Sequence, residues 1–169
     1  MKIIKLTKNK ECIVDDKYYN ELLKYKWYTN KGRSKNTFYA ETDLRKMVNG
    51  KYVGKRLNMH RLVMQLNGYD IKGKRVDHKD RNGLNNQISN LRISTHQENI
   101  RNSEKQSNNT SGYKGVSSIK NSYKWRAYIN IDKKQISLGR FVNKIDAAKA
   151  YDKAALKYFG EFANINGVL

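Results

Sequence analysis

Four polar side chains near the middle of the chain have the chemistry needed to hydrolyse a phosphodiester bond: Asp77, His78, Asn90 and Asn99. Such hydrolysis needs a base that takes a proton from water and a cation that offsets the charge developing on the phosphate. A histidine can act as the base near neutral pH. Carboxylate and carboxamide oxygens, such as those of Asp77 and Asn99, are the ligands that hard divalent cations prefer. Asp–His pairs are common, so these residues do not by themselves establish catalysis.

Residues 59–103 have the pattern of a helix, a strand, a polar loop, a second strand and a second helix. Apolar residues recur at helical spacing over 59–66, and strands are predicted over 75–78 and 91–93. Thr95 opens the tetrapeptide Thr-His-Gln-Glu, which has the spacing of a helix capping box. The second helix is therefore expected to begin at Thr95.

These elements must bring the four polar residues together. His78 is predicted at the end of the first strand, Asn90 just before the second, and Asn99 on the second helix, about one turn from its cap. Neighbours on a regular strand point to opposite faces. Asp77 and His78 can therefore reach one site only if the strand ends or twists there.

The residue types and spacings across this stretch agree with one known family. They are His60-Arg61-Leu62-Val63, Val76-Asp77-His78, Asn86, Asn90-Leu91-Arg92, and Thr95 through Asn99. This pattern strongly resembles the HNH endonucleases, in their phage and intron-encoded homing branch. The resemblance implies a ββα-metal fold, in which two strands and a helix hold one divalent ion, Mg²⁺ or Mn²⁺.

The resemblance also implies a role for each of the four polar residues. His78 would be the general base, and Asn90 would brace the loop and orient that base. Asp77 and Asn99 would hold the metal, with Asn99 standing where many members carry a histidine. His60 and His96 receive no assigned role.

The C-terminal residues 112–169 have the pattern of a separate unit. Apolar residues at 125, 127 and 129 share one face of a predicted strand, and polar residues share the other. A helix is predicted over 144–158, with Asn143 as its cap and alanines that let it lie close to a sheet. We expect a three-stranded antiparallel sheet packed on one helix, with its polar face bare.

This unit resembles the DNA-binding domain of the plant ethylene-response-factor (Apetala) type, which also occurs in phage and mobile HNH endonucleases. The match is carried by Ser111 through Val116, Lys124 through Ala127, Leu138 through Phe141 and Ala147 through Asp152. Members of that family lay the sheet in the major groove, where side chains can contact base edges. The residues that would face DNA are Lys114, Gly115, Ser117, Lys124, Arg126, Tyr128, Asn130, Gln135 and Ser137. Plant members have arginines where this chain has Ser117, Ile119 and Gln135, so their target sequence cannot be carried over.

The remaining segments complete the predicted domain organisation. Residues 1–58 alternate short apolar runs with turns, as in a small mixed α/β module, and Asn49-Gly50 marks a hairpin turn between strands over 38–41 and 51–57. Residues 104–111 contain no apolar side chain and are predicted to be a linker.

The predicted fold class is thus α+β. An HNH nuclease domain over 1–103, with the ββα-metal core at 59–103, precedes the linker, and a DNA-binding domain over 112–169 follows it.

Charge and composition limit the partners. The chain has 169 residues and a net charge of +20, with 24 basic against 11 acidic residues over 1–111 and 11 against 4 over 112–169. Because both halves are basic, we expect a nucleic acid as the partner, and the two resemblances imply that it is double-stranded DNA. The single cysteine, Cys12, excludes a disulfide framework and any zinc site with several thiolates. No apolar run could span a bilayer, and no signal peptide is visible.

Together these features predict a site-specific DNA endonuclease of the homing type. We expect a monomer, free of membranes and not secreted, in the cytoplasm of a bacterial or phage-infected cell. The alternative is a sequence-specific DNA-binding regulator with a silent nuclease site, against which the intact set of polar residues argues. An RNA-binding protein is a third alternative, but the chain lacks stacking-platform motifs.

Overall fold

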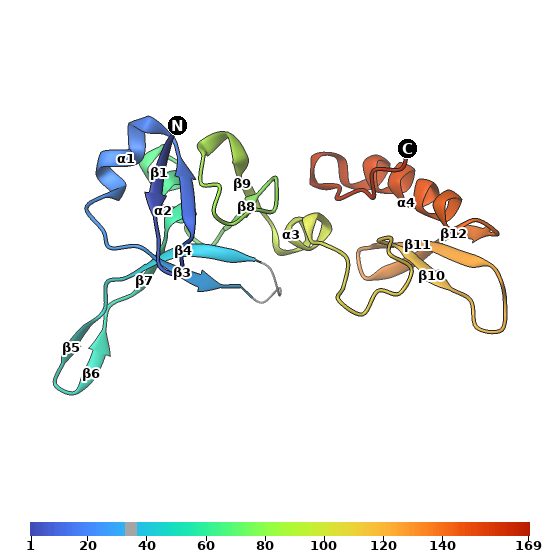
Figure 1. Cartoon of the computed structure of the whole chain (residues 1–169), viewed down its shortest axis with the longest axis horizontal. Helices are drawn as coiled ribbons and strands as arrows, with labels where there is room; N and C mark the ends of the chain where they lie inside the picture. Colours follow the sequence, from blue (N-terminus) through green and yellow to red (C-terminus); the bar gives the residue numbers. More distant parts are fainter. Residues whose placement is uncertain (33–36) are drawn as a thin grey trace. The chain divides into compact units, whose positions relative to one another are not determined.

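The computed structural model describes residues 1–32 and 37–169 and divides them into two compact units, Met1–His96 and Gln97–Leu169. The chain is a mixed α/β protein with several small antiparallel sheets (Figure 1). This agrees with the predicted class. Among the described residues, no helix combines the length and the apolar character needed to cross a membrane.

The first unit contains four small sheets and two α-helices in its described residues. In chain order the elements are β1 (Lys2–Lys5), β2 (Glu11–Val14), α1 (Asp16–Leu22), β3 (Tyr28–Lys31), β4 (Phe38–Asp43), β5 (Lys46–Val48), β6 (Lys51–Val53), β7 (Arg56–Asn58), α2 (Met59–Leu66), β8 (Arg75–His78), the 3₁₀ turn η1 (Ile88–Asn90) and β9 (Leu91–Ser94). The sheets are β1–β2, β3–β4–β7, β5–β6 and β8–β9.

The core of this unit forms around helix α2. Its Met59, Val63 and Met64 are buried together with Leu22 of α1 and Val14 of β2. The helical spacing of the apolar residues is therefore used to cover the small sheets. The β8–β9 pair lies beside this core, with Asp77 opposite Arg92 and His78 opposite Leu91.

The strand predicted over 51–57 is interrupted. Gly54 has φ +118°, and a Cβ there would lie 2.8 Å from the backbone oxygen of Leu44. Only glycine tolerates this close approach. The ribbon therefore breaks into the separate pairs β5–β6 and β4–β7.

The second unit begins within α3 (His96–Asn102), whose first residue belongs to the first unit. It continues with β10 (Val116–Ser118), β11 (Trp125–Ile131), β12 (Lys134–Phe141), α4 (Lys144–Phe159) and the 3₁₀ turn η2 (Gly160–Phe162). The strand order is β10–β11–β12. Ala127 and Ile129 of β11 are buried against α4, whose alanines permit close packing. The Asn143 side chain caps α4 by accepting a hydrogen bond from the backbone N–H of Ile145 at 2.8 Å.

The segment 104–111 differs from the predicted linker, because the structure divides the chain at residues 96 and 97 instead. Ser111 is buried, and its hydroxyl donates to the backbone oxygen of Val116 at 2.8 Å. Asn109 donates to the backbone oxygen of Tyr113 at 2.9 Å. A segment without apolar side chains is thus held in the second unit by hydrogen bonds, which composition does not reveal.

Candidate active site

His78 lies at the end of β8 with only 5 % of its surface exposed. Its Nε2 is 3.2 Å from Oδ1 of Asn86, and the Asn86 amide donates from Nδ2 to Sγ of Cys12 at 2.7 Å. Because a carboxamide oxygen accepts, this contact corresponds to the tautomer that carries the imidazole proton on Nε2. Nδ1 is therefore the basic nitrogen of the neutral ring.

The N-terminal module holds Asn86 in place. The backbone N–H of Asn86 donates to the oxygen of Ile13 at 2.8 Å, and that of Ile13 donates to the oxygen of Leu84 at 2.9 Å. Asn86 is fully buried, and Cys12 in turn lies against Met59, with 3.3 Å between their sulfur atoms. Strand β2 thus orients a loop residue 74 positions later in the sequence.

Asn90 clamps the loop that joins β8 to β9. Its Nδ2 donates to Oδ1 of Asp80 at 2.9 Å and to the backbone oxygen of Asn85 at 2.8 Å, and its Oδ1 accepts from the Asp80 N–H at 3.0 Å. Its backbone oxygen also accepts from the N–H of Lys79 at 2.8 Å. These bonds brace the loop, whereas the side chain hydrogen-bonded to His78 is that of Asn86.

Asp77 forms a buried ion pair with Arg92, its cross-strand neighbour. Its Oδ2 accepts from Nε of Arg92 at 3.0 Å and from Nη2 at 2.9 Å. The arginine offsets the cost of burying this carboxylate. The sequence shows that Asp77 precedes His78, but the alternation of residues along the two predicted strands did not indicate that Arg92 pairs with Asp77.

Two further aromatic rings, those of Tyr39 and His60, surround His78. The centroid of the His78 ring lies 5.0 Å from that of His60 and 5.9 Å from that of Tyr39. Burial, with a smaller contribution from the charges of His78 and Arg61, lowers the pKa of His60 to about 3. Among the described residues, His60 Nδ1 is a buried atom without a hydrogen-bond partner. His60 is therefore a neutral neighbour of the base at physiological pH.

Burial also lowers the pKa of His78, although the hydrogen bond to Asn86 and the carboxylates of Asp80 and Asp77 act in the opposite direction. The imidazole is thus neutral near pH 7. A neutral, oriented imidazole is the form that can accept a proton from water.

The donor set suits only some metal ions. Within residues 1–32 and 37–169, no group of three or more His, Cys, Asp and Glu side chains could hold an ion. Mg²⁺ requires few protein ligands, since it keeps several waters and uses substrate phosphates. Structural zinc requires four ligands and does not fit. The remaining predicted ligand, Asn99, lies half-buried on α3 in the second unit.

Most of the predicted DNA-contacting residues lie on the open face of the β10–β12 sheet. Arg126, Tyr128 and Asn130 alternate with the buried residues of β11. By register, Ser117 is opposite Arg126, Ser137 opposite Tyr128 and Gln135 opposite Asn130. The Arg126 guanidinium lies over the Tyr128 ring at 5.4 Å.

Two more cations lie near this face. Lys124 is exposed just before strand β11. Arg140, exposed and opposite Arg126, adds a second cation that the predicted set omitted.

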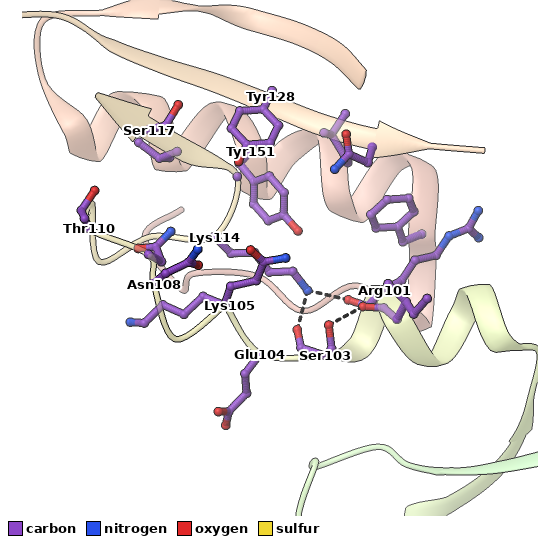
Figure 2. A pocket seen from close by; sticks show the side chains of 18 residues that line it. Arg101, Ser103, Glu104, Lys105, Asn108, Thr110, Lys114, Ser117, Tyr128 and Tyr151 are labelled. Carbon is purple, nitrogen blue, oxygen red and sulfur yellow. Dashed lines mark hydrogen bonds between the residues drawn. The ribbon is translucent and has the colours of Figure 1, made fainter. Parts of the chain in front are cut away.

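Lys114 and Gly115 are used differently. The Lys114 ammonium donates to the backbone oxygens of Arg101 at 2.7 Å and Ser103 at 2.5 Å, beside a pocket of about 420 Å³ (Figure 2). A Cβ at Gly115 would lie 2.0 Å from the Tyr151 ring, so this position requires glycine for packing. Both residues stabilise the second unit.

Asn86 and Arg92 belong to the sequence pattern described above, but no contact was predicted for either of them. Asn86 follows Asn85 in a polar loop, and the sequence does not reveal which of the two amides is buried. The partner of Arg92 follows from the β8–β9 register. Tyr39 had no signal at all.

Comparison with known proteins agrees with this geometry. The model of a family described as HNH endonuclease matches residues 58–101. An uncharacterized HNH endonuclease of Acanthamoeba polyphaga mimivirus is 35 % identical over 151 residues, which cover 86 % of this chain and 68 % of that protein. Protein 3.8 of Escherichia phage T7 is 41 % identical over 69 residues, covering 41 % of this chain and 57 % of that protein. The family match spans the β8–β9 pair and the buried His78. The chain therefore belongs to the HNH endonuclease family and is a DNA nuclease, and nucleases of this family generally use a divalent metal ion.

Proposed function

We propose that the chain is a site-specific endonuclease of the homing type. It cuts double-stranded DNA with His78 as the general base and recognises its target site with the open face of the β10–β12 sheet. The observation that carries the catalytic part is the hydrogen bond from His78 Nε2 to Asn86. It leaves Nδ1 as the nitrogen that can take a proton.

In the proposed reaction, His78 Nδ1 accepts the proton of the attacking water, whose oxygen forms the new bond to phosphorus. The bond between phosphorus and one deoxyribose oxygen breaks at the same time, and this leaving oxygen takes up a proton from solvent. Asn86 is a positioning residue that holds the ring through Nε2. Asn90 keeps the loop closed around it. A divalent cation, Mg²⁺ or Mn²⁺, held by Asp77 and Asn99 would supply positive charge to the phosphate.

A titration of activity against Mg²⁺ tests the two metal ligands. Asp77→Asn and Asn99→Ala should each raise the Mg²⁺ concentration needed for half-maximal cleavage, because each weakens or removes an oxygen donor. Asp70→Asn, a change at an exposed carboxylate of the first unit, serves as the control. An unchanged midpoint in both test variants would place the metal on other residues.

The proposed reading surface is supported by exposure and charge. Arg126, Asn130 and Gln135 are exposed on one face of the sheet, and the charge of the unit is positive. Side chains that project from a sheet can hydrogen-bond to base edges in the major groove. The resemblance of residues 112–169 to the ethylene-response-factor type supports the same assignment.

One observation favours a second candidate, a DNA-binding regulator that does not cut. Asp77 is paired with Arg92, and such a pair competes with a cation for the carboxylate. Incubation with supercoiled plasmid, with and without Mg²⁺ or Mn²⁺, separates the two. Nicked or linear product that depends on the metal and disappears in His78→Ala supports the nuclease. Tight binding to one site without any product supports the regulator.

A further inference from the structure

The β5–β6 hairpin is a fully exposed ribbon of the first unit. Within the described part of the chain, its strands form a two-stranded sheet of their own, with Lys46 opposite Val53, Met47 opposite Tyr52 and Val48 opposite Lys51. It extends away from the rest of the unit (Figure 1). Asn49 and Gly50 both have positive φ, which is typical of the tight turn that joins two twisted strands.

This hairpin exposes apolar side chains on both faces. Tyr52 is 67 % exposed, Met47 and Val53 are each 57 % exposed, and Val48 is 49 % exposed. An isolated two-stranded hairpin is at best marginally stable in water, and exposed apolar clusters generally mark an interaction site. Four large apolar side chains on one projecting ribbon therefore indicate a partner.

The charged side chains within the hairpin segment are all basic, and the adjacent Asp43 pairs with Arg45 at its base. Residues 44–56 contain five basic side chains and no acidic one. The basic residues are Arg45, Lys46, Lys51, Lys55 and Arg56. A basic ribbon with an apolar surface is complementary to a polyanion that also offers apolar edges. Duplex DNA has both, in its phosphates and in its thymine methyl groups and sugars.

The base of the hairpin is anchored to the rest of the unit. Asp43 accepts hydrogen bonds from Nε and Nη2 of Arg45 and lies 3.9 Å from Nε of Arg56. The backbone N–H of Leu44 donates to the oxygen of Lys55 at 3.0 Å, and the Arg45 guanidinium lies 5.3 Å from the Tyr52 ring centroid. These contacts order the base of the hairpin before any partner binds, and this order lowers the entropic cost of docking.

We propose that the β5–β6 hairpin is a second DNA-contacting element that enters the major groove of the substrate duplex. The inference rests on the proposed DNA substrate, and it adds a contact outside the catalytic site and outside the β10–β12 sheet. A two-stranded ribbon fits the width of a major groove. Met47 and Tyr52, which share one face, lie against base and sugar edges. Lys46 and Lys51 extend from the ribbon to the phosphates on either side.

Binding to a fluorescent random-sequence duplex, measured by anisotropy on the full chain in EDTA over a range of salt, tests this. Lys46→Gln with Lys51→Gln should weaken binding on the order of 10- to 50-fold at low salt and reduce the salt slope by about two, since each lost phosphate contact removes about 0.9. Met47→Ser with Tyr52→Ser should weaken binding roughly fivefold or more at an unchanged slope. The matched control is Lys26→Gln with Lys72→Gln, which removes the same charge from exposed positions elsewhere in the unit.

Three results would overturn the proposal. One is an equal loss in the hairpin lysine variant and the control, which would mean that only net charge matters. Another is wild-type affinity in the serine variant. The third is a hydroxyl-radical footprint of the same extent for wild type and both hairpin variants. Thermal unfolding of the core should be unchanged in all variants, because the substituted side chains are exposed and lie outside the hydrophobic core of the unit. A wild-type protein that binds duplex DNA but does not cut it at a preferred site would refute the proposed site-specific cleavage and leave this binding result intact.

Discussion

The β8–β9 pair and the β10–β12 sheet place polar side chains in opposite environments. On β8 and β9, Asp77, His78 and Arg92 are all less than a tenth exposed, and the two charged side chains pair with one another. On β10–β12, Arg126, Asn130 and Gln135 are exposed, and the buried face is apolar. Both regions are small antiparallel sheets, but their polar residues serve different purposes.

The difference follows from what each task requires. A base must keep one protonation state and one orientation, so it benefits from burial and from a fixed hydrogen-bond partner. Side chains that recognise a duplex must be accessible and exchange water for base edges when the partner arrives. Substitutions in the first region should therefore change rate, and those in the second should change affinity and site preference.

The largest effect is expected for His78→Ala. Cleavage should fall by about 10²–10⁴-fold while DNA affinity stays within a few-fold, because a general base contributes mainly to the transition state. Single-turnover cleavage and anisotropy of the same preparation measure both quantities. Lys72→Gln is the control. Cleavage near the wild-type rate in the presence of Mg²⁺ would show that another residue is the base.

Asn86→Ala should have the next largest effect, a loss of about 10- to 100-fold in cleavage rate. The ¹⁵N chemical shifts of the His78 ring provide a reading independent of activity. In the wild type they should report a proton on Nε2, and in the variant a mixture of the two tautomers. A single Nε2–H tautomer in the variant would mean that Asn86 does not position the base.

A smaller effect is expected on the exposed sheet. Arg126→Ala should cost about 1–3 kcal/mol at the preferred site if the arginine makes a bidentate base contact, with cleavage of bound DNA unchanged. Lys149→Ala, at an exposed position of α4, is the control. If Arg126→Ala weakened binding to all DNA sequences equally, Arg126 would contact only phosphates. The exposed sheet would then not differ from the catalytic region by recognising bases.

The smallest effect concerns Cys12, which connects β2 to Asn86. Burial raises the pKa of its thiol from 9.0 to about 11. The folded state therefore holds this proton more tightly than the unfolded chain, and the stability is present below pH 9 and lost as pH rises toward 11. Between pH 9 and 10 the wild type should lose about 1 kcal/mol more unfolding free energy than Cys12→Ala.

Urea unfolding followed through Trp27, in a Trp125→Phe background, isolates the first unit for this comparison. Because both proteins contain the same lysines and tyrosines, the contribution of these groups to the pH dependence of the unfolding free energy cancels in the comparison. Parallel pH profiles would show that the thiol ionises equally easily in the folded and unfolded states.

Local patterns in the sequence were sufficient for several elements. The apolar spacing over 59–66 corresponds to α2, and the strands predicted at 75–78 and 91–93 correspond to β8 and β9. The Asn49-Gly50 turn and the Asn143 cap are also where they were predicted. These features depend on neighbours within a few residues, so a local pattern contains the information that specifies them.

Long-range contacts were decided only by the tertiary structure. The sequence marked His78 as a base, but its tautomer depends on Asn86, whose amide is fixed by Cys12 on a strand near the N-terminus. The pairing of Asp77 with Arg92 depends on strand register, and the anchoring of residues 104–111 depends on hydrogen bonds to the chain that follows. Burying a polar group costs free energy unless it forms a hydrogen bond or an ion pair, and the position of its partner depends on how distant segments pack.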